Sequence, residues 1–129
     1  LRIAGLLDAV PDAGAGREAM VARVVAVAQH LRGDEVVMSV IHNAPNIAIT
    51  YITSRLGTSQ QILVDALAEA IKAGQSEGSI RAGDAHQMAA MCLLITQSTI
   101  QSAQMVADLL DAESLDVELA HSLNGYLKP

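Results

Sequence analysis

The 129-residue sequence contains no phenylalanine or tryptophan and only two tyrosines. Hydrophobic residues nevertheless make up 51% of the chain, so its core has to consist of Ala, Val, Leu, Ile and Met, as in closely packed helices. This length suits one domain with a sizeable core, and we expect a single domain over residues 1–129. Because the sequence does not begin with Met, we also expect it to be a fragment of a longer protein.

A cluster of basic residues is also missing. The eight Lys and Arg residues are scattered from Arg2 to Lys128, and the net charge is −6, so this chain by itself lacks the positive patch that a nucleic-acid surface requires. The single cysteine, Cys92, excludes an intrachain disulfide. No apolar run approaches the roughly 20 residues of a membrane span, and there is no signal-peptide pattern. We therefore expect a cytoplasmic protein without membrane contact.

Strand pairs are absent as well. The β-branched run at residues 47–53 has no partner strand elsewhere in the sequence, whereas apolar residues recur at helical spacing along most of the chain. The sequence therefore predicts an all-α fold of about six helices, at residues 1–10, 15 or 17–31, 34–41, 46–72 or 73, 84–110 and 115–127.

The stretch 84–110 is the expected centre of this fold. Asp84 followed by Gln87 has the spacing of a capping box at a helix start. Residues 88–95 are apolar on every side of a helical wheel and therefore need cover on every side. The second half, 96–104, alternates Thr, Ser and Gln with Ile100 and Ala103, which is typical of a helix–helix contact surface.

Catalytic and metal-binding patterns are weak. Glu118 and His121 have the Glu-x-x-His spacing of di-iron bundles, but such bundles use the motif twice, and it occurs once here. Cys92 has no basic neighbour in sequence that would lower its pKa. We expect no catalytic residue, no metal and no cofactor; a bundle-type enzyme remains the alternative that metal analysis would test.

Five methionines allow two interpretations. They fill gaps in an aromatic-poor core, or they line a cavity that adapts to an apolar guest. In the second case Tyr51 supplies a polar group, and Arg55 either meets a carboxylate of the guest or forms a surface salt bridge.

Two passages resemble the TetR family of transcriptional regulators. One is the helix 17–31 followed by Arg32-Gly-Asp-Glu35, which opens a short helix. The other is the end of the long helix at Gly74, followed by Gly78-Ser-Ile-Arg-Ala-Gly-Asp84. The resemblance covers essentially the whole chain and implies the C-terminal, effector-binding and dimerisation domain of a bacterial regulator, with a helix-turn-helix DNA reader in a preceding domain.

The resemblance also implies a homodimer in which the last two helices of each subunit form a four-helix bundle. The expected dimer face comprises Leu93, Gln97, Ile100, Gln101, Gln104, Leu115, Leu119, Leu123 and Tyr126. A hydrophobic effector, fatty acyl or drug-like, is expected to contact Met20, Val24, Met38, Tyr51, Ile52, Arg55, Met88, Met91, Cys92 and Ile95. A helical interaction module without a pocket is the alternative that stays open.

Overall fold

The computed structural model describes residues 16–43 and 57–129. All regular secondary structure in these two ranges is helical, which agrees with the all-α prediction. The five helices are α2 (Arg17–Arg32), α3 (Glu35–Asn43), α5 (Gly57–Glu77), α6 (Ala85–Ser102) and α7 (Ala112–Leu127). The described residues thus contain five of the six expected helices; the expected helix 1–10 and the part of the long helix before Gly57 lie outside them.

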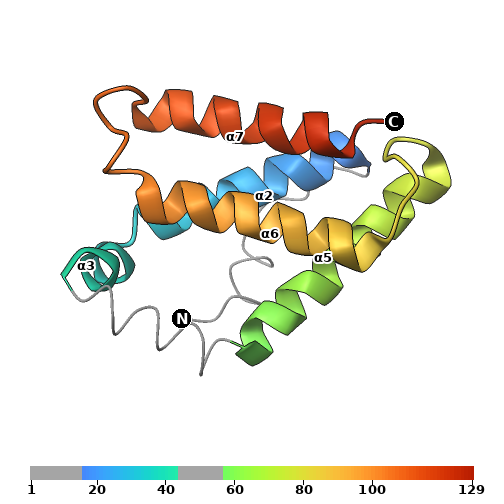
Figure 1. The fold of residues 1–129 in the computed structure, drawn as a ribbon, viewed down its shortest axis with the longest axis horizontal. Coiled ribbons are helices and arrows are strands. Elements are labelled where there is room, and N and C mark those ends of the chain that lie inside the picture. Colours follow the sequence, from blue (N-terminus) through green and yellow to red (C-terminus); the bar gives the residue numbers. More distant parts are fainter. Residues whose placement is uncertain (1–15, 44–56) are drawn as a thin grey trace.

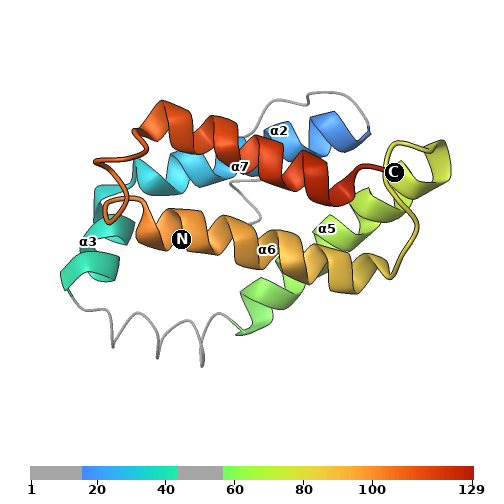
Figure 2. The same ribbon diagram turned by 45° about the horizontal axis from the view of Figure 1, so that its top comes forward.

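Helix α6 occupies the centre of the described structure and packs against α5, α2 and α7 (Figure 1). Helices α2 and α6 run in the same direction, and α7 returns antiparallel to both (Figures 1 and 2). Helix α5 crosses α6 obliquely, and α3 lies beyond the end of α2. More than one helix therefore packs on the apolar first half of α6, but the predicted cover on every side is not found, because Met91 and Leu94 are 43% and 57% exposed.

The core lies between α2, α5, α6 and α7 and consists of aliphatic and sulfur-containing side chains, as the composition predicts. On α7, a leucine at every fourth position from Leu115 to Leu127 places one apolar stripe against α2 and α6. The largest side chains that are fully buried in this core are Ile71, Leu119, Leu123, Leu127, Val21 and Cys92.

Two helix starts follow the sequence prediction. The Asp84 carboxylate accepts a hydrogen bond of 3.0 Å from the backbone N–H of Gln87, and Asp34 accepts one of 2.9 Å from Val36 N–H at the start of α3. Each bond satisfies a backbone donor that the first turn of a helix leaves unpaired.

The central helix is shorter than predicted. The sequence predicts one helix over 84–110, but α6 ends at Ser102 and residues 103–110 form turns. In these turns Met105 and Leu109 are 80% and 87% exposed, so the apolar residues that suggested helix have nothing to pack against. Helical periodicity stabilises a helix mainly by burying one face, and none of the helices that the structure describes packs against Met105 or Leu109 closely enough to bury them.

The long helix, by contrast, extends beyond its predicted end at Lys72 or Ala73, because α5 continues to Glu77. Gly74 lies inside the helix, and its carbonyl accepts hydrogen bonds from Ser79 N–H at 2.9 Å and Ile80 N–H at 3.2 Å. Gly78, at φ +88°, is the residue that reverses the chain, and its N–H donates to Gln75 O. This is a Schellman end, in which glycine adopts the left-handed conformation without strain.

The turn between α5 and α6, residues 78–84, then binds the C-terminal end of α7. Arg81 N–H donates to the carbonyl of Leu127 at 2.8 Å, and Arg81 Nε donates to the carbonyl of Tyr126, also at 2.8 Å. The guanidinium carbon lies 4.7 Å from the centroid of the Tyr126 ring. A cation at a helix C-terminus is favourable because the last carbonyls are unpaired and carry partial negative charge.

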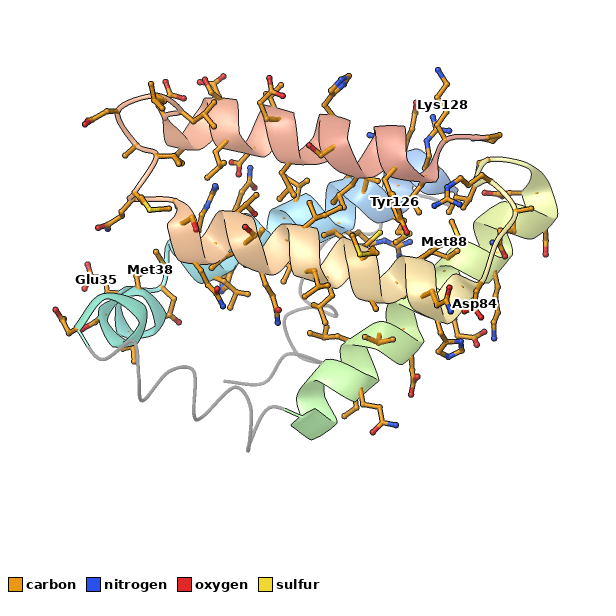
Figure 3. All side chains as sticks on the ribbon, in the orientation of Figure 1. Glu35, Met38, Asp84, Met88, Tyr126 and Lys128 are labelled. Carbon is orange, nitrogen blue, oxygen red and sulfur yellow. The ribbon has the colours of Figure 1, made fainter. Side chains whose placement is uncertain are left out.

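The start of α2 is attached to the same turn. Arg17 donates from Nε to Asn124 at 3.1 Å and from a terminal nitrogen to Ser79 O at 3.0 Å, and its N–H donates to Ser79 Oγ. At this end of the molecule, which contains Asp84, Met88 and Tyr126 (Figure 3), the start of α2 and the end of α7 are thus hydrogen-bonded to the turn that joins α5 to α6. Relative movement of α5 and α6 therefore acts on contacts of α2 and α7.

Candidate ligand-binding groove

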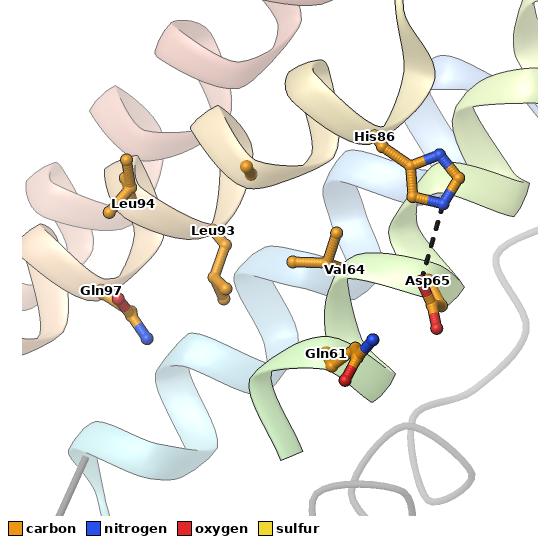
Figure 4. A pocket seen from close by; sticks show the side chains of 8 residues that line it. Gln61, Val64, Asp65, His86, Leu93, Leu94 and Gln97 are labelled. Carbon is orange, nitrogen blue, oxygen red and sulfur yellow. Dashed lines mark ion pairs between the residues drawn. The ribbon is translucent and has the colours of Figure 1, made fainter. Parts of the chain in front are cut away.

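A shallow groove of about 570 Å³, largely open to solvent, runs along the surface where α5 packs against α6 (Figure 4). The lining residues recur at helical spacing on the two facing surfaces and are Gln61, Val64 and Asp65 of α5, with His86, Ala90, Leu93, Leu94 and Gln97 of α6.

The groove has an apolar middle and polar ends. Val64 and Leu93 face each other across it, with Gln97 towards one end (Figure 4). At the other end His86 Nε2 lies 3.6 Å from Asp65 Oδ1. Both side chains of this pair are more than half exposed to solvent, so the pair is accessible to a ligand head group.

The groove is distinct from the pocket that the sequence predicts. Of the ten predicted ligand contacts, Tyr51, Ile52 and Arg55 lie outside the described residues. The other seven are absent from the lining of the groove. Three of them belong to the packed core, at 1–3% exposure: Met20, Met88 and Cys92.

The remaining predicted contacts are distributed around the core. Val24, Met38 and Ile95 are partly buried and pack against it. Met91 is 43% exposed. Met20, Met38 and Met88 therefore act as packing residues in this structure, whereas Met91 is a surface residue.

The residues of α6 that are predicted for the dimer face have different environments within the chain. Leu93 and Gln97 line the groove towards α5, and Ile100 is buried at 8% exposure. Gln101 and Gln104 are exposed, the latter in the turn after α6.

On α7, the leucines predicted for the same dimer face are buried by the chain's own α2 and α6, and Tyr126 lies partly buried beneath Arg81. Side chains that are already buried within one chain offer little further area to a second one. The buried leucines are Leu115, Leu119 and Leu123.

Six of the lining residues were not identified from the sequence. The sequence does contain a pattern that could have identified part of the lining: along α6, the lining residues His86, Ala90, Leu93 and Gln97 repeat at intervals of three or four. However, α6 is apolar on so many sides that spacing alone does not indicate which stripe borders a groove. The six residues are Gln61, Val64, Asp65, His86, Ala90 and Leu94.

Three described residues were considered for chemistry from the sequence: Cys92, Glu118 and His121. Burial raises the pKa of the Cys92 thiol to about 11, only partly offset by the nearby positive charge of Arg81. Cys92 therefore remains a protonated, inert thiol near neutral pH. Glu118 and His121 are both exposed on α7, and in the part of the chain that the structure describes no three His, Cys, Asp or Glu residues are grouped closely enough to hold a metal ion.

A second polar cluster joins α2 to α7 on the far side of the core. Arg32 and Asp116 form an ion pair whose side chains are only 12% and 14% exposed, and Gln29 donates to the other carboxylate oxygen of Asp116 at 2.9 Å. Arg32 and Gln29 of α2 both bind Asp116 of α7, so we assign this cluster to the packing of α2 against α7. Among the described helices, none combines the length and apolar character that crossing a membrane requires.

The sequence of this chain is similar to those of several named proteins. It is 54% identical over 125 residues to the uncharacterized HTH-type transcriptional regulator Mb2274c of Mycobacterium bovis, and equally identical to the uncharacterized HTH-type transcriptional regulator Rv2250c of Mycobacterium tuberculosis. The match covers 97% of this chain and 65% of the length of these relatives. No family model matches the chain, and no solved structure matches it significantly. The chain is thus similar, over nearly all of its length, to proteins named as transcriptional regulators rather than as enzymes.

Proposed function

We propose that this chain is the effector-binding and dimerisation domain of a TetR-like transcriptional repressor. The observation that carries the proposal is the 54% identity, over 97% of the chain, to proteins named HTH-type transcriptional regulators. The chain spans only 65% of the length of those relatives, which leaves room in the full protein for a DNA reader. A net charge of −6 with scattered basic residues suits a domain that does not itself bind DNA.

The proposed effector site is the groove between α5 and α6. Its apolar middle, formed by Val64 and Leu93, would hold the body of a hydrophobic molecule, and its polar ends would orient it. The pocket predicted from the sequence remains a proposal for a larger guest. Such a guest would have to separate α6 from α2, because Met20, Met88 and Cys92 are tightly buried there.

The proposed dimer uses the outer surfaces of α6 and α7. The leucine stripe of α7 is buried within the chain, so the interface would have to use exposed apolar side chains instead. Met91 and Leu94 of α6 are 43% and 57% exposed, and Val117 of α7 is 62% exposed. A contact between two copies would remove these three apolar side chains from water, which favours association.

Effector binding would act by population shift. A molecule wedged between α5 and α6 favours arrangements in which the two helices are further apart. The turn 78–84 joins these helices to α7 through Arg81 and to α2 through Ser79, so the change would reach both. Displacing a DNA reader in this way requires an effector whose affinities for the two arrangements differ.

The test uses the full-length protein and a fluorescent DNA fragment from upstream of its own coding sequence. We expect salt-sensitive binding of the DNA by a dimer, and release when an effector is added. Native mass spectrometry of the purified protein would reveal a bound effector. Failure of the full-length protein to bind any DNA more tightly than a random sequence would overturn the proposal.

A pair of variants links the effector to the groove. Ala90→Trp would fill the groove, whereas Ala66→Trp places the same side chain on an exposed position of α5 that does not line it. We expect Ala90→Trp to abolish release of DNA by the effector and Ala66→Trp to leave it intact. If Ala90→Trp still releases DNA like the wild type, the effector binds outside this groove; if no effector releases DNA from the wild type either, the chain is a helical interaction module without a ligand site.

A further inference from the structure

The charges that line the groove are few and lie together. Among its described lining residues, only Asp65 and His86 have ionisable side chains, and both are at the same end (Figure 4). The other polar lining residues, Gln61 and Gln97, are uncharged amides. A ligand head group at the ionisable end therefore meets one carboxylate and one imidazole, and a ligand tail meets Val64 and Leu93.

Asp65 carries one of the fourteen formal negative charges of the chain, whereas His86 counts as neutral in its net charge of −6. His86 lies 3.6 Å from Asp65, farther than a short charge-assisted hydrogen bond of about 2.7–2.9 Å. Asp65 is also 61% exposed, so a cationic group can approach it from solvent without displacing a buried partner.

The charge of the rest of the chain acts in the same direction. Fourteen acidic residues outnumber eight basic ones, which gives a net charge of −6. On α5, Glu69 lies one turn beyond Asp65 and is already paired with Lys72 at 3.3 Å. The potential around a protein of this charge raises the local concentration of cations and lowers that of anions.

We infer that the groove selects an amphiphile with a cationic head, such as a primary alkylamine, in preference to a fatty acid anion. The ammonium group binds Asp65 at the mouth, and the alkyl chain lies along Val64 and Leu93 towards Gln97. This inference rests on the proposed effector site and narrows its ligand class. It replaces the fatty acyl effector considered from the sequence with a ligand of the opposite charge.

The experiment uses three probes with the same alkyl chain: decylamine, decanol and decanoate. Their binding to the purified protein is measured by isothermal titration calorimetry at about pH 7, where the amine is protonated and the acid is ionised. All concentrations are kept below those at which micelles form. Because an exposed ion pair changes affinity by up to about fivefold, we expect decylamine to bind about three- to fivefold more tightly than decanol, and decanoate to bind more weakly than decanol.

Three variants test whether the charge of Asp65 causes the preference for decylamine over decanol. Asp65→Asn keeps the size of the side chain and removes its charge, so the preference for decylamine over decanol should fall to less than about twofold. Glu69→Gln removes one negative charge from the same helix outside the groove, and the preference should persist. His86→Gln removes the competitor for Asp65, so the preference should persist or increase.

The outcomes separate this inference from the function on which it rests. If decanol binds as tightly as decylamine, or if Asp65→Asn retains the full preference, the charge selection is wrong. If the three probes bind equally and Ala90→Trp abolishes their binding, the groove remains a ligand site and only the ligand class is refuted. If none of them binds, both the ligand class and the groove as an effector site for hydrophobic molecules are overturned.

Discussion

Two glycines inside helices give a prediction in which the same substitution has opposite effects. Gly74 of α5 is buried against the side chain of Ile80, whereas Gly125 of α7 is exposed and has no atom within 4 Å of the position that a Cβ would occupy. Replacing glycine by alanine in a helix interior favours folding by about 1 kcal/mol. At Gly125 nothing opposes this gain, and we expect Gly125→Ala to stabilise the protein by about 0.5–1 kcal/mol.

At Gly74 the added methyl group would collide with Ile80. The new Cβ would lie 2.7 Å from Cγ1 and 3.2 Å from Cβ of Ile80, and closer still to Cδ1. Carbon atoms in contact prefer about 3.5–4.0 Å, and a rotation of Ile80 moves its outer carbons but not its Cβ. Ile80 is only 3% exposed, so there is little space into which it could move. Overpacking of this kind costs about 1–3 kcal/mol. After the gain in helix propensity of about 1 kcal/mol is subtracted, we expect Gly74→Ala to destabilise the protein by up to about 2 kcal/mol.

The assay is urea denaturation followed by circular dichroism, with thermal melting as a second readout. A change of 1 kcal/mol corresponds to roughly 4 °C in Tm for a domain of this size. Gly74→Ala should therefore lower Tm by up to about 8 °C, and Gly125→Ala should raise it by about 2–4 °C. In an Ile80→Ala background, Gly74→Ala should become neutral or stabilising, since the obstructing side chain is gone. A Gly74→Ala protein that is stabilised as much as Gly125→Ala would refute the close packing of Ile80 on α5.

Three further predictions concern the α5–α6 turn and two titratable groups. Arg81→Met removes a charge-assisted hydrogen bond to Tyr126 O and a cation–π contact, so it should destabilise the protein by about 2–3 kcal/mol in urea denaturation. The control Lys72→Met removes a charge from an exposed ion pair and should cost less than about 0.5 kcal/mol. Equal effects of the two substitutions would contradict a role for the turn in holding α7. The Cys92 thiol has a pKa of about 11, above that of an unfolded cysteine, so stability should fall as pH rises from about 9 to 11, and a thiol reagent should modify Cys92 in native protein far more slowly than in urea. Hydrogen bonds from Ser114 lower the pKa of Asp111. The stability that this cap contributes should therefore be present above the pKa of an unfolded aspartate, near 3.9, and be lost as pH falls through the lower pKa of the folded state. Asp111→Asn should remove that part of the acid dependence, and an unchanged acid profile would argue against the cap.

The sequence determined the local features of the fold. The helix predicted to begin at Ala15 or Arg17 and end at Leu31 is α2, Arg17–Arg32, and Asp84 caps α6 as its spacing with Gln87 predicts. These features depend on interactions within a few residues: a capping hydrogen bond, an apolar stripe at intervals of three and four, and a chain-reversing glycine at Gly78. Similarity to named regulators likewise agrees with the regulatory role that two sequence passages suggested.

Tertiary structure alone decided which surface each stripe meets. Because the first half of α6 is apolar all round, its periodicity carries no information about direction: Leu93 and Gln97 border the groove, Met91 is exposed, and Cys92 is buried. Partners also decided how far each helix extends. Ile80 packs on Gly74 inside α5, so that glycine does not end the helix, whereas Met105 and Leu109 find no partner and the chain turns. Hydrogen bonding and side-chain spacing act over one or two helical turns, but burial depends on segments far apart in the chain, so only the packed helices decide it.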